Sequence, residues 1–391
     1  MMLWVLLVST FVVLAFAKRA RAEDVEFFDR SEGEQFAHKW GYTDTRFEFV
    51  DDRTVRVTGN RYPICGFDMP YFIPFVEEIL QIPIRAEDMG EVVAHENLSV
   101  PLQNDAFLAA VKNALKDDQV SQVDHDRLVH SHGQLSVDEI YRILYDCPPE
   151  RLVDVVLYPE SDADVQKVIQ LANEHDVVLV AYGGGTNVSG ALAIPTSEMR
   201  MVASVDMRRM KAIVWLDEEN FQACVEAGIS GKQLENVLNA KGYTSGHDPD
   251  SLEFAPLGGW IATNASGMKK NRYGNIEDIV LEATLITPVG EVETKQATPR
   301  NATGVPPRTL LFGSEGNFGI ITKAVMKIYK QPQVRKFGSL AFPQFENGVK
   351  FLKALRQTGQ IPASIRLVNN NEFRFGQALK PAPTGLGKLE Q

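Results

Sequence analysis

Two glycine-rich stretches contain the residues whose types and spacing could do chemistry. The first spans residues 181–190 and has three consecutive glycines; the second spans residues 258–267. Glycine has no Cβ, so backbone N–H groups in such loops can approach an anion closely. Small hydroxyl and amide side chains accompany them: Thr186, Asn187, Thr263, Asn264 and Ser266. Together the stretches predict two loops that hold one diphosphate from both sides.

The first stretch follows a strand, helix and strand pattern. Residues 151–157 and 176–181 are short apolar runs, and Ser161 with Asp164 predicts the start of an intervening helix. The glycines therefore follow the end of a strand, where α/β sheets bind ligands. The stretch is no Walker phosphate loop, and Val188 stands where the dinucleotide fingerprint needs its third glycine. A tight turn that binds nothing stays open as an alternative.

Longer runs of sequence make a family resemblance specific. Residues 159–185 resemble the FAD-binding domain of the vanillyl-alcohol-oxidase type, and residues 246–278 closely resemble the alkyldihydroxyacetonephosphate (alkylglycerone-phosphate) synthase family, flavoenzymes that form the ether bond of ether lipids. The similarity extends from about Lys39 to Pro381. Further matches are Arg61–Pro63, Asp126–Arg127, Ser131–Gly133, Gly313–Gly316, Pro362–Leu367, Phe373–Gly376 and Ala378–Pro381.

The resemblance implies an α+β fold built around a two-subdomain FAD-binding domain of the vanillyl-alcohol-oxidase type. We expect a hydrophobic anchor or signal over residues 1–22, an N-terminal helical region over 23–145, the FAD-binding domain over 146–332, and the start of an incomplete α/β substrate-binding cap over 333–391. Helices are expected at 105–116, 137–144, 232–241 and 348–356, strands at 221–227 and 319–329, and a hairpin from 279–287 and 291–294.

The resemblance also implies FAD, held noncovalently because the first loop has no histidine for a covalent bond. Four segments would hold it. The first is Tyr182, Gly183, Gly184, Gly185, Thr186 and Asn187; the second is Pro249, Asp250, Ser251, Leu252, Glu253, Phe254 and Ala255. The third is Thr263, Asn264, Ala265 and Ser266; the fourth is Glu315, Gly316, Asn317, Phe318, Gly319, Ile320 and Ile321. The chain departs from the expected pattern at Asn187, Asn264, Asn317 and Phe318, where small or polar character is kept.

One arginine is a candidate catalytic residue by the same resemblance. Arg366 matches an active-site arginine of the family, and its guanidinium could hold a phosphate or carboxylate; an ordinary salt bridge is the alternative. The reaction implied exchanges the acyl chain of acyl-dihydroxyacetone phosphate for a fatty alcohol, with the flavin holding the substrate and no net redox change. The family's cap also carries a tyrosine and a histidine-rich run for proton transfer. The seven histidines here are scattered, and His247 is interpreted as structural, so we expect weak or absent synthase activity.

Two other functions stay open. An FAD-dependent 2-hydroxy-acid oxidoreductase would share the flavin loops but lack residues 250–254 and 362–366 as they stand here. A non-catalytic flavin-binding protein would bind FAD without turnover.

Composition limits the partners. The formal charge of −11 over 391 residues argues against a nucleic-acid partner. The basic cluster of Lys269, Lys270 and Arg272 could meet a phosphate or be a solvated loop.

The three separated cysteines fit reduced, buried thiols. A homodimer is implied by the resemblance.

The N-terminus bears on location. Residues 1–17 are uncharged and apolar, and basic residues follow at Lys18, Arg19 and Arg21, which favours a membrane-associated anchor with the rest of the chain on the cytoplasmic side. Asn187 and Asn264 lie in glycosylation sequons inside the flavin segments, which argues against a luminal site. The family resembled is peroxisomal; an endoplasmic reticulum membrane with a cytoplasmic catalytic side is the alternative.

Overall fold

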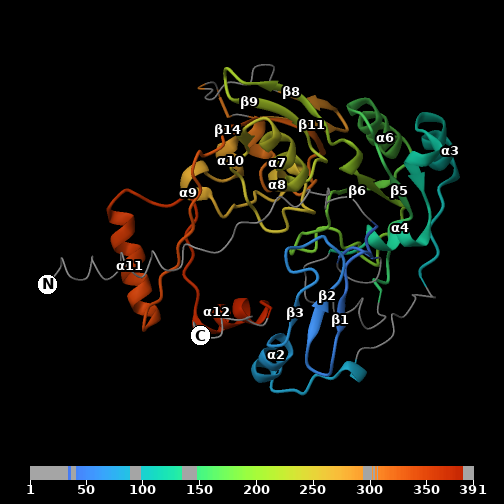
Figure 1. The fold of residues 1–391 in the computed structure, drawn as a ribbon. Coiled ribbons are helices and arrows are strands. Elements are labelled where there is room, and N and C mark those ends of the chain that lie inside the picture. The colour runs from blue at the N-terminus through green and yellow to red at the C-terminus, as the bar shows by residue number, and fades with distance from the viewer. Residues whose placement is uncertain are drawn as a thin grey trace.

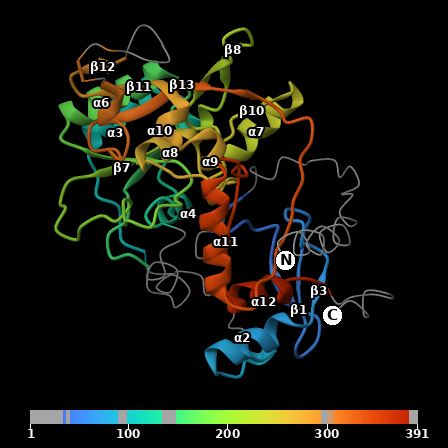
Figure 2. The same ribbon diagram turned by 90° about the vertical axis from the view of Figure 1, so that its left-hand side faces the viewer.

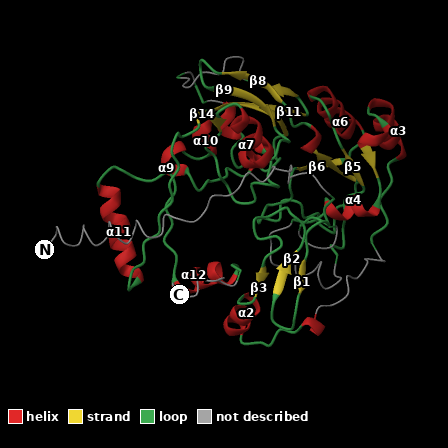
Figure 3. Cartoon of the chain, viewed as in Figure 1, coloured by secondary structure: helices red, strands yellow, loops and turns green. Residues whose placement is uncertain are grey.

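The computed structural model describes residues 34–36, 41–88, 98–133, 148–293, 302, 304–305 and 307–381. The segment 1–22 and the helix expected at 137–144 lie outside these residues. Two sheets and their helices form the upper part of the molecule in Figure 1, and a small sheet lies below them. Figure 3 shows the same view with helices and strands coloured separately.

A four-stranded sheet carries the first glycine stretch. Its order is β4 (Val120–Ser121), β5 (Val155–Leu157), β7 (Val202–Asp206) and β6 (Val178–Tyr182). Strands β5 and β6 run parallel to β7, whereas β4 is antiparallel to β5. Strand β7, which the sequence did not predict, separates the two strands of the expected strand–helix–strand unit.

Helix α6 (Asp162–Glu174) connects β5 and β6, and its expected start is confirmed. The Ser161 hydroxyl accepts a hydrogen bond from the Asp164 backbone N–H at 3.2 Å, which satisfies one of the free donors of the first turn. The apolar face of α6 packs with α3 (Asp105–Ala114) in one hydrophobic core that includes Phe107, Val111 and Val165. This core fixes the strand end from which the glycines emerge.

A five-stranded antiparallel sheet forms the second half of the domain. Its order is β12 (Gly290–Val292), β11 (Val280–Thr287), β13 (Ile320–Lys327), β9 (Gln222–Glu226) and β8 (Ile213–Asp217). The expected hairpin of β11 and β12 is confirmed, with Leu285 opposite Val292. Helices α7 (Gly231–Ala240), α8 (Leu257–Ala262) and α10 (Ile276–Ile279) contribute side chains to the core of this sheet.

The region before the flavin domain contains more than helices. Strands β1 (Phe47–Phe49), β2 (Val55–Val57) and β3 (Asp68–Met69) form an antiparallel sheet beside α2 (Phe72–Leu80) and before α4 (Asp124–Val129). The resemblance implied a helical region here and named no strand. Alternating burial of Val55 and Val57 in a small core explains the strand.

The remaining elements are short or belong to the expected start of the cap. Helices α11 (Phe345–Gln357) and α12 (Asn370–Ala378) follow the flavin domain, and the turned view in Figure 2 shows α11 leading down toward α12 and α2. Arg374 on α12 binds Glu78 on α2 through two hydrogen bonds of 2.8 and 2.5 Å. The other elements are α9 (Lys270–Tyr273), β10 (Tyr243–Thr244), β14 (Tyr329–Lys330), and the 3-10 turns Ala86–Asp88, Asp117–Gln119, Met207–Arg209 and Pro307–Leu310.

Candidate functional site

The first and second flavin segments are pressed together. Strand β6 ends at Tyr182, and the three glycines then run against residues 254–256. A Cβ added to Gly183 would lie 2.5 Å from Pro256 Cγ, and one added to Gly184 would lie 2.2 Å from the Phe254 carbonyl oxygen. Gly185 has φ +65°, in the left-handed region that favours glycine. Packing against residues 254–256 or a left-handed backbone therefore favours glycine at each of the three positions, whether or not a ligand is bound.

The fourth segment is joined by hydrogen bonds to the residues just before the third segment. The backbone N–H of Glu315 donates to the Ala262 carbonyl at 3.0 Å, and that of Gly313 to the Ile261 carbonyl at 3.2 Å. The Ser189 hydroxyl, just after the first segment, donates to the Glu315 carboxylate at 2.7 Å. Contacts thus connect all four segments, directly or through the residues next to them in sequence.

Burial sorts the predicted flavin residues into two layers. Most of the exposed ones offer small or polar groups; they are Asp250, Thr263, Asn264, Ser266, Glu315, Gly316 and Asn317, and the large apolar Phe318 is exposed with them. The buried ones support them from beneath; they are Tyr182, Gly184, Gly185, Pro249, Phe254, Ala255, Ile320 and Ile321. The rest are half-buried. Glycine backbone with small polar side chains over an apolar floor is a donor set suited to a diphosphate and the flat rings attached to it.

The prediction that the second glycine stretch is a loop from residue 258 onward is wrong. Both glycines lie in α8, and the Gly258 N–H donates to the Ala227 carbonyl at 2.8 Å, so it is not free for a phosphate. A Cβ on Gly258 would approach Ala227 Cβ to 3.0 Å. Close helix packing accounts for this glycine, and only residues 263–267 of the second stretch form a loop.

The sequence did not single out a buried polar network beneath Tyr182. Asp206 ends β7 opposite Tyr182 in the sheet register, and its carboxylate binds Arg208 Nη2 at 2.6 Å and His130 Nε2 at 2.9 Å. Burial raises the pKa of Asp206, but the charge and hydrogen bonds of Arg208 and His130 outweigh this and hold that pKa well below its usual range. The sequence feature that could have pointed to this network is an aspartate directly after the short run 202–205.

The region before the flavin domain covers the second segment. The Tyr42 ring stacks on Phe254 with centroids 4.8 Å apart, and the Arg61 guanidinium carbon lies 3.6 Å from the centroid of the Tyr42 ring. Arg61 is buried and binds Asp44. Burial raises the pKa of Tyr42 to about 12, against the opposing charge of Arg61. The matched residue Arg61 therefore supports the flavin segment through Tyr42.

In the described part of the chain, Arg366 is bound to a residue of the expected cap and not to a flavin segment. It is exposed, and its guanidinium forms an ion pair with Glu372 on α12. Among the described residues, its hydrogen bonds reach none of the four flavin segments. The ion-pair alternative is thus present in the structure, and a catalytic role for Arg366 stays a prediction. In the basic cluster, Lys269 pairs with Asp248 at 3.1 Å.

His247 is buried against aromatic core rather than exposed to the site. Its ring lies edge-on to Trp260 at 5.0 Å between centroids, and neither ring nitrogen has a hydrogen-bond partner among the described residues. Burial lowers the pKa of His247 to about 4. A neutral histidine in an apolar setting agrees with the structural role expected for it.

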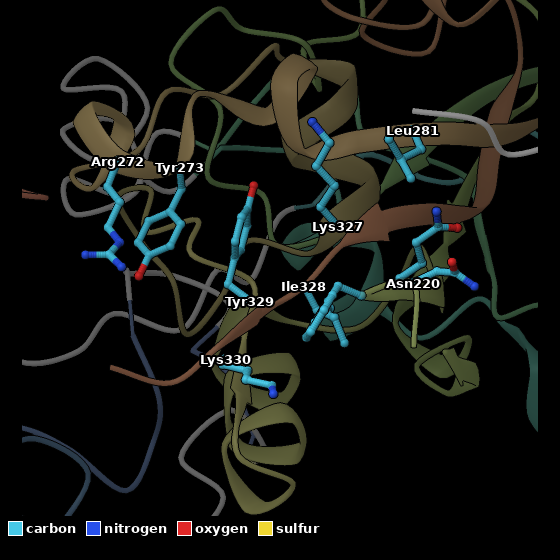
Figure 4. Close-up of a pocket in the computed structure, with 10 residues that line it drawn as sticks. Asn220, Arg272, Tyr273, Leu281, Lys327, Ile328, Tyr329 and Lys330 are labelled. Atoms are coloured by element: carbon cyan, nitrogen blue, oxygen red, sulfur yellow. The ribbon is translucent and has the colours of Figure 1, made fainter. Parts of the chain in front are cut away.

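A separate pocket lies where α9 faces β9, β13 and β14 (Figure 4). It has a volume of about 550 Å³, and Tyr273 and Tyr329 contact each other in its wall at 4.8 Å between centroids. Arg272, Lys327 and Lys330 also line it. The Lys327 ammonium donates to the Asp278 carbonyl at 2.7 Å.

The described ranges contain no metal cluster and no membrane-spanning helix. No group of three metal-ligating side chains is found there. Cys65 and Cys224 are free thiols, half-buried and buried respectively, and burial raises the pKa of Cys224. No described helix is long and apolar enough to cross a bilayer.

Comparison with known proteins agrees with this geometry. The FAD binding domain family matches residues 153–295, and the C-terminal domain of FAD linked oxidases matches residues 331–390. The chain is 39% identical over 344 residues to the alkyldihydroxyacetonephosphate synthase of Caenorhabditis elegans, covering 88% of this chain and 57% of the relative. It is 33% identical over 355 residues to that of Dictyostelium discoideum, with the same two coverages of 88% and 57%.

A solved structure of an alkyldihydroxyacetonephosphate synthase shares the fold. The TM-score is 0.79 at 31% identity, covering 90% of this chain and 65% of that one. A mitochondrial D-lactate dehydrogenase of Arabidopsis thaliana is 29% identical over 310 residues, covering 78% of this chain and 51% of the relative. The chain spans a little over half the length of the curated relatives it matches.

The fold and the site define an FAD-dependent protein of the vanillyl-alcohol-oxidase type, with FAD as its cofactor. Within that class, the chain belongs to the family of the alkyldihydroxyacetonephosphate synthases.

Proposed function

We propose that this chain acts in ether-lipid synthesis as an FAD-dependent alkylglycerone-phosphate synthase. Its substrates would be acyl-dihydroxyacetone phosphate and a fatty alcohol, which replaces the acyl chain. The observation that carries the proposal is the meeting of four flavin segments, with Gly184 against Phe254 and Ser189 bound to Glu315. Identity of 39% to a synthase over 88% of the chain directs it to this reaction.

Different segments would hold different parts of the cofactor. Backbone N–H groups of the first segment and the polar side chains of Thr263 and Ser266 would hold the diphosphate, while the exposed fourth segment would lie near the adenosine or the ring system. When bound, FAD supplies an electron-accepting ring that can hold the substrate carbon without net redox change. The protein's own part is to bind, orient and exclude water.

Arg366 is the residue proposed to meet the substrate phosphate. Its partner Glu372 is a single exposed carboxylate, and a phosphate offers more oxygen atoms and more negative charge to the guanidinium fork. A substrate phosphate could therefore displace Glu372 from Arg366 at little cost, because exposed ion pairs are weak.

The first test is an absorbance spectrum of the purified full chain with FAD, with a bound flavin band at about 450 nm. The second supplies palmitoyl-dihydroxyacetone phosphate and labelled hexadecanol. Ether product without net flavin reduction supports the synthase, at the low rate expected from the scattered histidines. Flavin bleaching by D-lactate, with none by the lipid substrates, would favour the 2-hydroxy-acid oxidoreductase. A yellow protein inert to both would favour a non-catalytic flavin-binding protein.

A third test separates substrate binding from turnover. Palmitoyl-dihydroxyacetone phosphate should perturb the spectrum of the bound flavin. Arg366→Ala should raise the substrate concentration that gives half of this spectral change by on the order of tenfold. Arg374→Ala is the matched control, because Arg374 is engaged with Glu78. If both variants needed the same substrate concentration, Arg366 would not be a substrate-binding residue.

Peroxisomal location, membrane association and a homodimer are also proposed, on the strength of the family resemblance alone. An endoplasmic reticulum membrane with the catalytic side in the cytoplasm is the alternative location. Cell fractionation, flotation with vesicles and light scattering of the purified chain test the three proposals separately.

A further inference from the structure

The ring of His130 is held between two acceptors. It lies at the end of α4 and is 1% exposed. Nδ1 is 2.6 Å from the backbone carbonyl oxygen of Asp126, and Nε2 is 2.9 Å from Asp206 Oδ2. A carbonyl oxygen can only accept, so Nδ1 must carry a proton.

The same holds at Nε2 provided that Asp206 is ionised. Its Oδ1 accepts the backbone N–H and the side-chain Nε of Arg208 at 2.9 and 3.0 Å. Its Oδ2 accepts Arg208 Nη2 at 2.6 Å. A carboxylate that receives this many donors, one of them a guanidinium, is an anion with no proton to give. Each ring nitrogen of His130 thus faces an acceptor oxygen, an arrangement in which a doubly protonated ring can donate on both sides.

Both side chains that bind Asp206 lie close to one aromatic ring. The His130 ring centroid lies 4.2 Å from that of Tyr182, and the Arg208 guanidinium carbon lies 5.2 Å from it. Both separations fall within cation–π range. Tyr182 is the last residue of β6, and its hydroxyl lies 3.0 Å from where a Cβ on Gly185 would be.

We propose that His130 is a buried imidazolium that positions Tyr182, and through it the first glycine loop, for FAD binding. It is a positioning residue, because it is buried beneath the loop rather than exposed toward the cofactor. The cationic form is required because a neutral ring would set an unprotonated nitrogen against an acceptor oxygen at 2.6 or 2.9 Å and would lose its attraction to the Tyr182 ring.

The groups that face His130 from every neighbouring element agree with this charge. Asp126 on α4 is an additional carboxylate whose pKa is lowered by His125, Ser121 and the nearby His130, against the effect of burial. Tyr158, after β5, presents its ring edge at 5.9 Å between centroids. Among the described neighbours, the cation Arg208 is paired with Asp206, and His125, whose pKa is raised chiefly by its hydrogen bond to Asp126, contacts that carboxylate at 3.5 Å.

The first experiment reads the protonation state directly. The full chain is labelled with ¹⁵N-histidine, loaded with FAD, and its ring nitrogens are observed by NMR at neutral pH; His130→Gln assigns the signal. We expect directly bonded protons on both nitrogens of His130. A neutral ring, with one nitrogen unprotonated, would overturn the proposal whatever the variants do.

The second experiment measures FAD affinity by quenching of flavin fluorescence. His130→Gln keeps a polar side chain but not the charge, and should weaken FAD binding by on the order of tenfold. His130→Arg keeps a cation with several donors and should restore affinity to within about threefold of the parent. His125→Gln, on the exposed side of α4, is the matched control and should leave affinity unchanged. Parent-like FAD binding by His130→Gln would contradict the proposal.

This inference rests on FAD binding and not on alkyl transfer. A chain that binds FAD but has no synthase activity would leave it intact while ending the proposed reaction. A chain that takes up no FAD would fail the proposed function first, and the NMR experiment on the same protein would still decide the charge of His130.

Discussion

Gly184 and Phe254 approach each other so closely that the second flavin segment occupies the place of a side chain on the first. A Cβ on Gly184 would lie 2.2 Å from the Phe254 carbonyl oxygen and 2.6 Å from its carbonyl carbon. The obstruction is backbone, which cannot rotate away as a side chain can. Contact between the two segments therefore depends on this glycine.

Gly184→Ala should separate the two segments and weaken FAD binding by at least about tenfold, because the added methyl group displaces residue 254. Equilibrium titration with FAD measures the change. Gly376→Ala is the control: nothing lies within 4 Å of a Cβ there, so its affinity should equal that of the parent. Unchanged binding by Gly184→Ala would show that the approach is not needed.

The hydrogen bond between Ser189 and Glu315 should couple the first and fourth segments. Both residues are exposed, so Ser189→Ala is expected to weaken FAD binding only by about two- to fivefold. Glu315→Gln should have a similar effect, and the double variant should be no worse than either one. Fully additive losses in this double-mutant cycle would mean that the two side chains act independently.

Stability should fall in acid because of His247. Burial lowers its folded pKa to about 4 from the usual 6.5, so between these values the unfolded state binds the extra proton. The stabilisation is complete above about pH 6.5 and is lost as the pH falls toward about 4, amounting to about 3 kcal/mol. His247→Phe removes the titrating group. Urea unfolding at a series of pH values should show a flatter profile for this variant; parallel profiles would argue against a buried neutral ring.

Asp154 should be a strong determinant of stability. It is fully buried, its carboxylate accepts the backbone N–H groups of Leu102 at 2.8 Å and Val202 at 2.7 Å, and it pairs with Arg151 at 2.6 Å. Asp154→Ala removes the carboxylate that pairs with Arg151 and the acceptor of both N–H groups, and should cost about 3–5 kcal/mol of unfolding free energy. Glu87→Gln, which affects only an exposed pair with Arg85, should leave stability nearly unchanged. Denaturant midpoints measure both.

Local sequence patterns predicted the elements that carry the site. Ser161 and Asp164 marked the start of α6, and the apolar run before Gly183 became β6. Such signals depend on hydrogen bonds and side-chain spacing within a few residues, so they can be recognised without the rest of the chain. Strand β7 escaped notice because a strand buried on both faces has no alternation to distinguish it.

The sequence determined the family, the cofactor and the positions at which glycine had to stand. Only the tertiary structure shows why each glycine is there. A side chain on Gly184 would collide with the Phe254 carbonyl, whereas Gly258 allows α8 to pack closely against Ala227. The tertiary structure also brought His130 to Asp206 across 76 positions of sequence. Such pairings depend on which strands become neighbours in a sheet, and that is fixed by the packing of the whole core rather than by any local pattern.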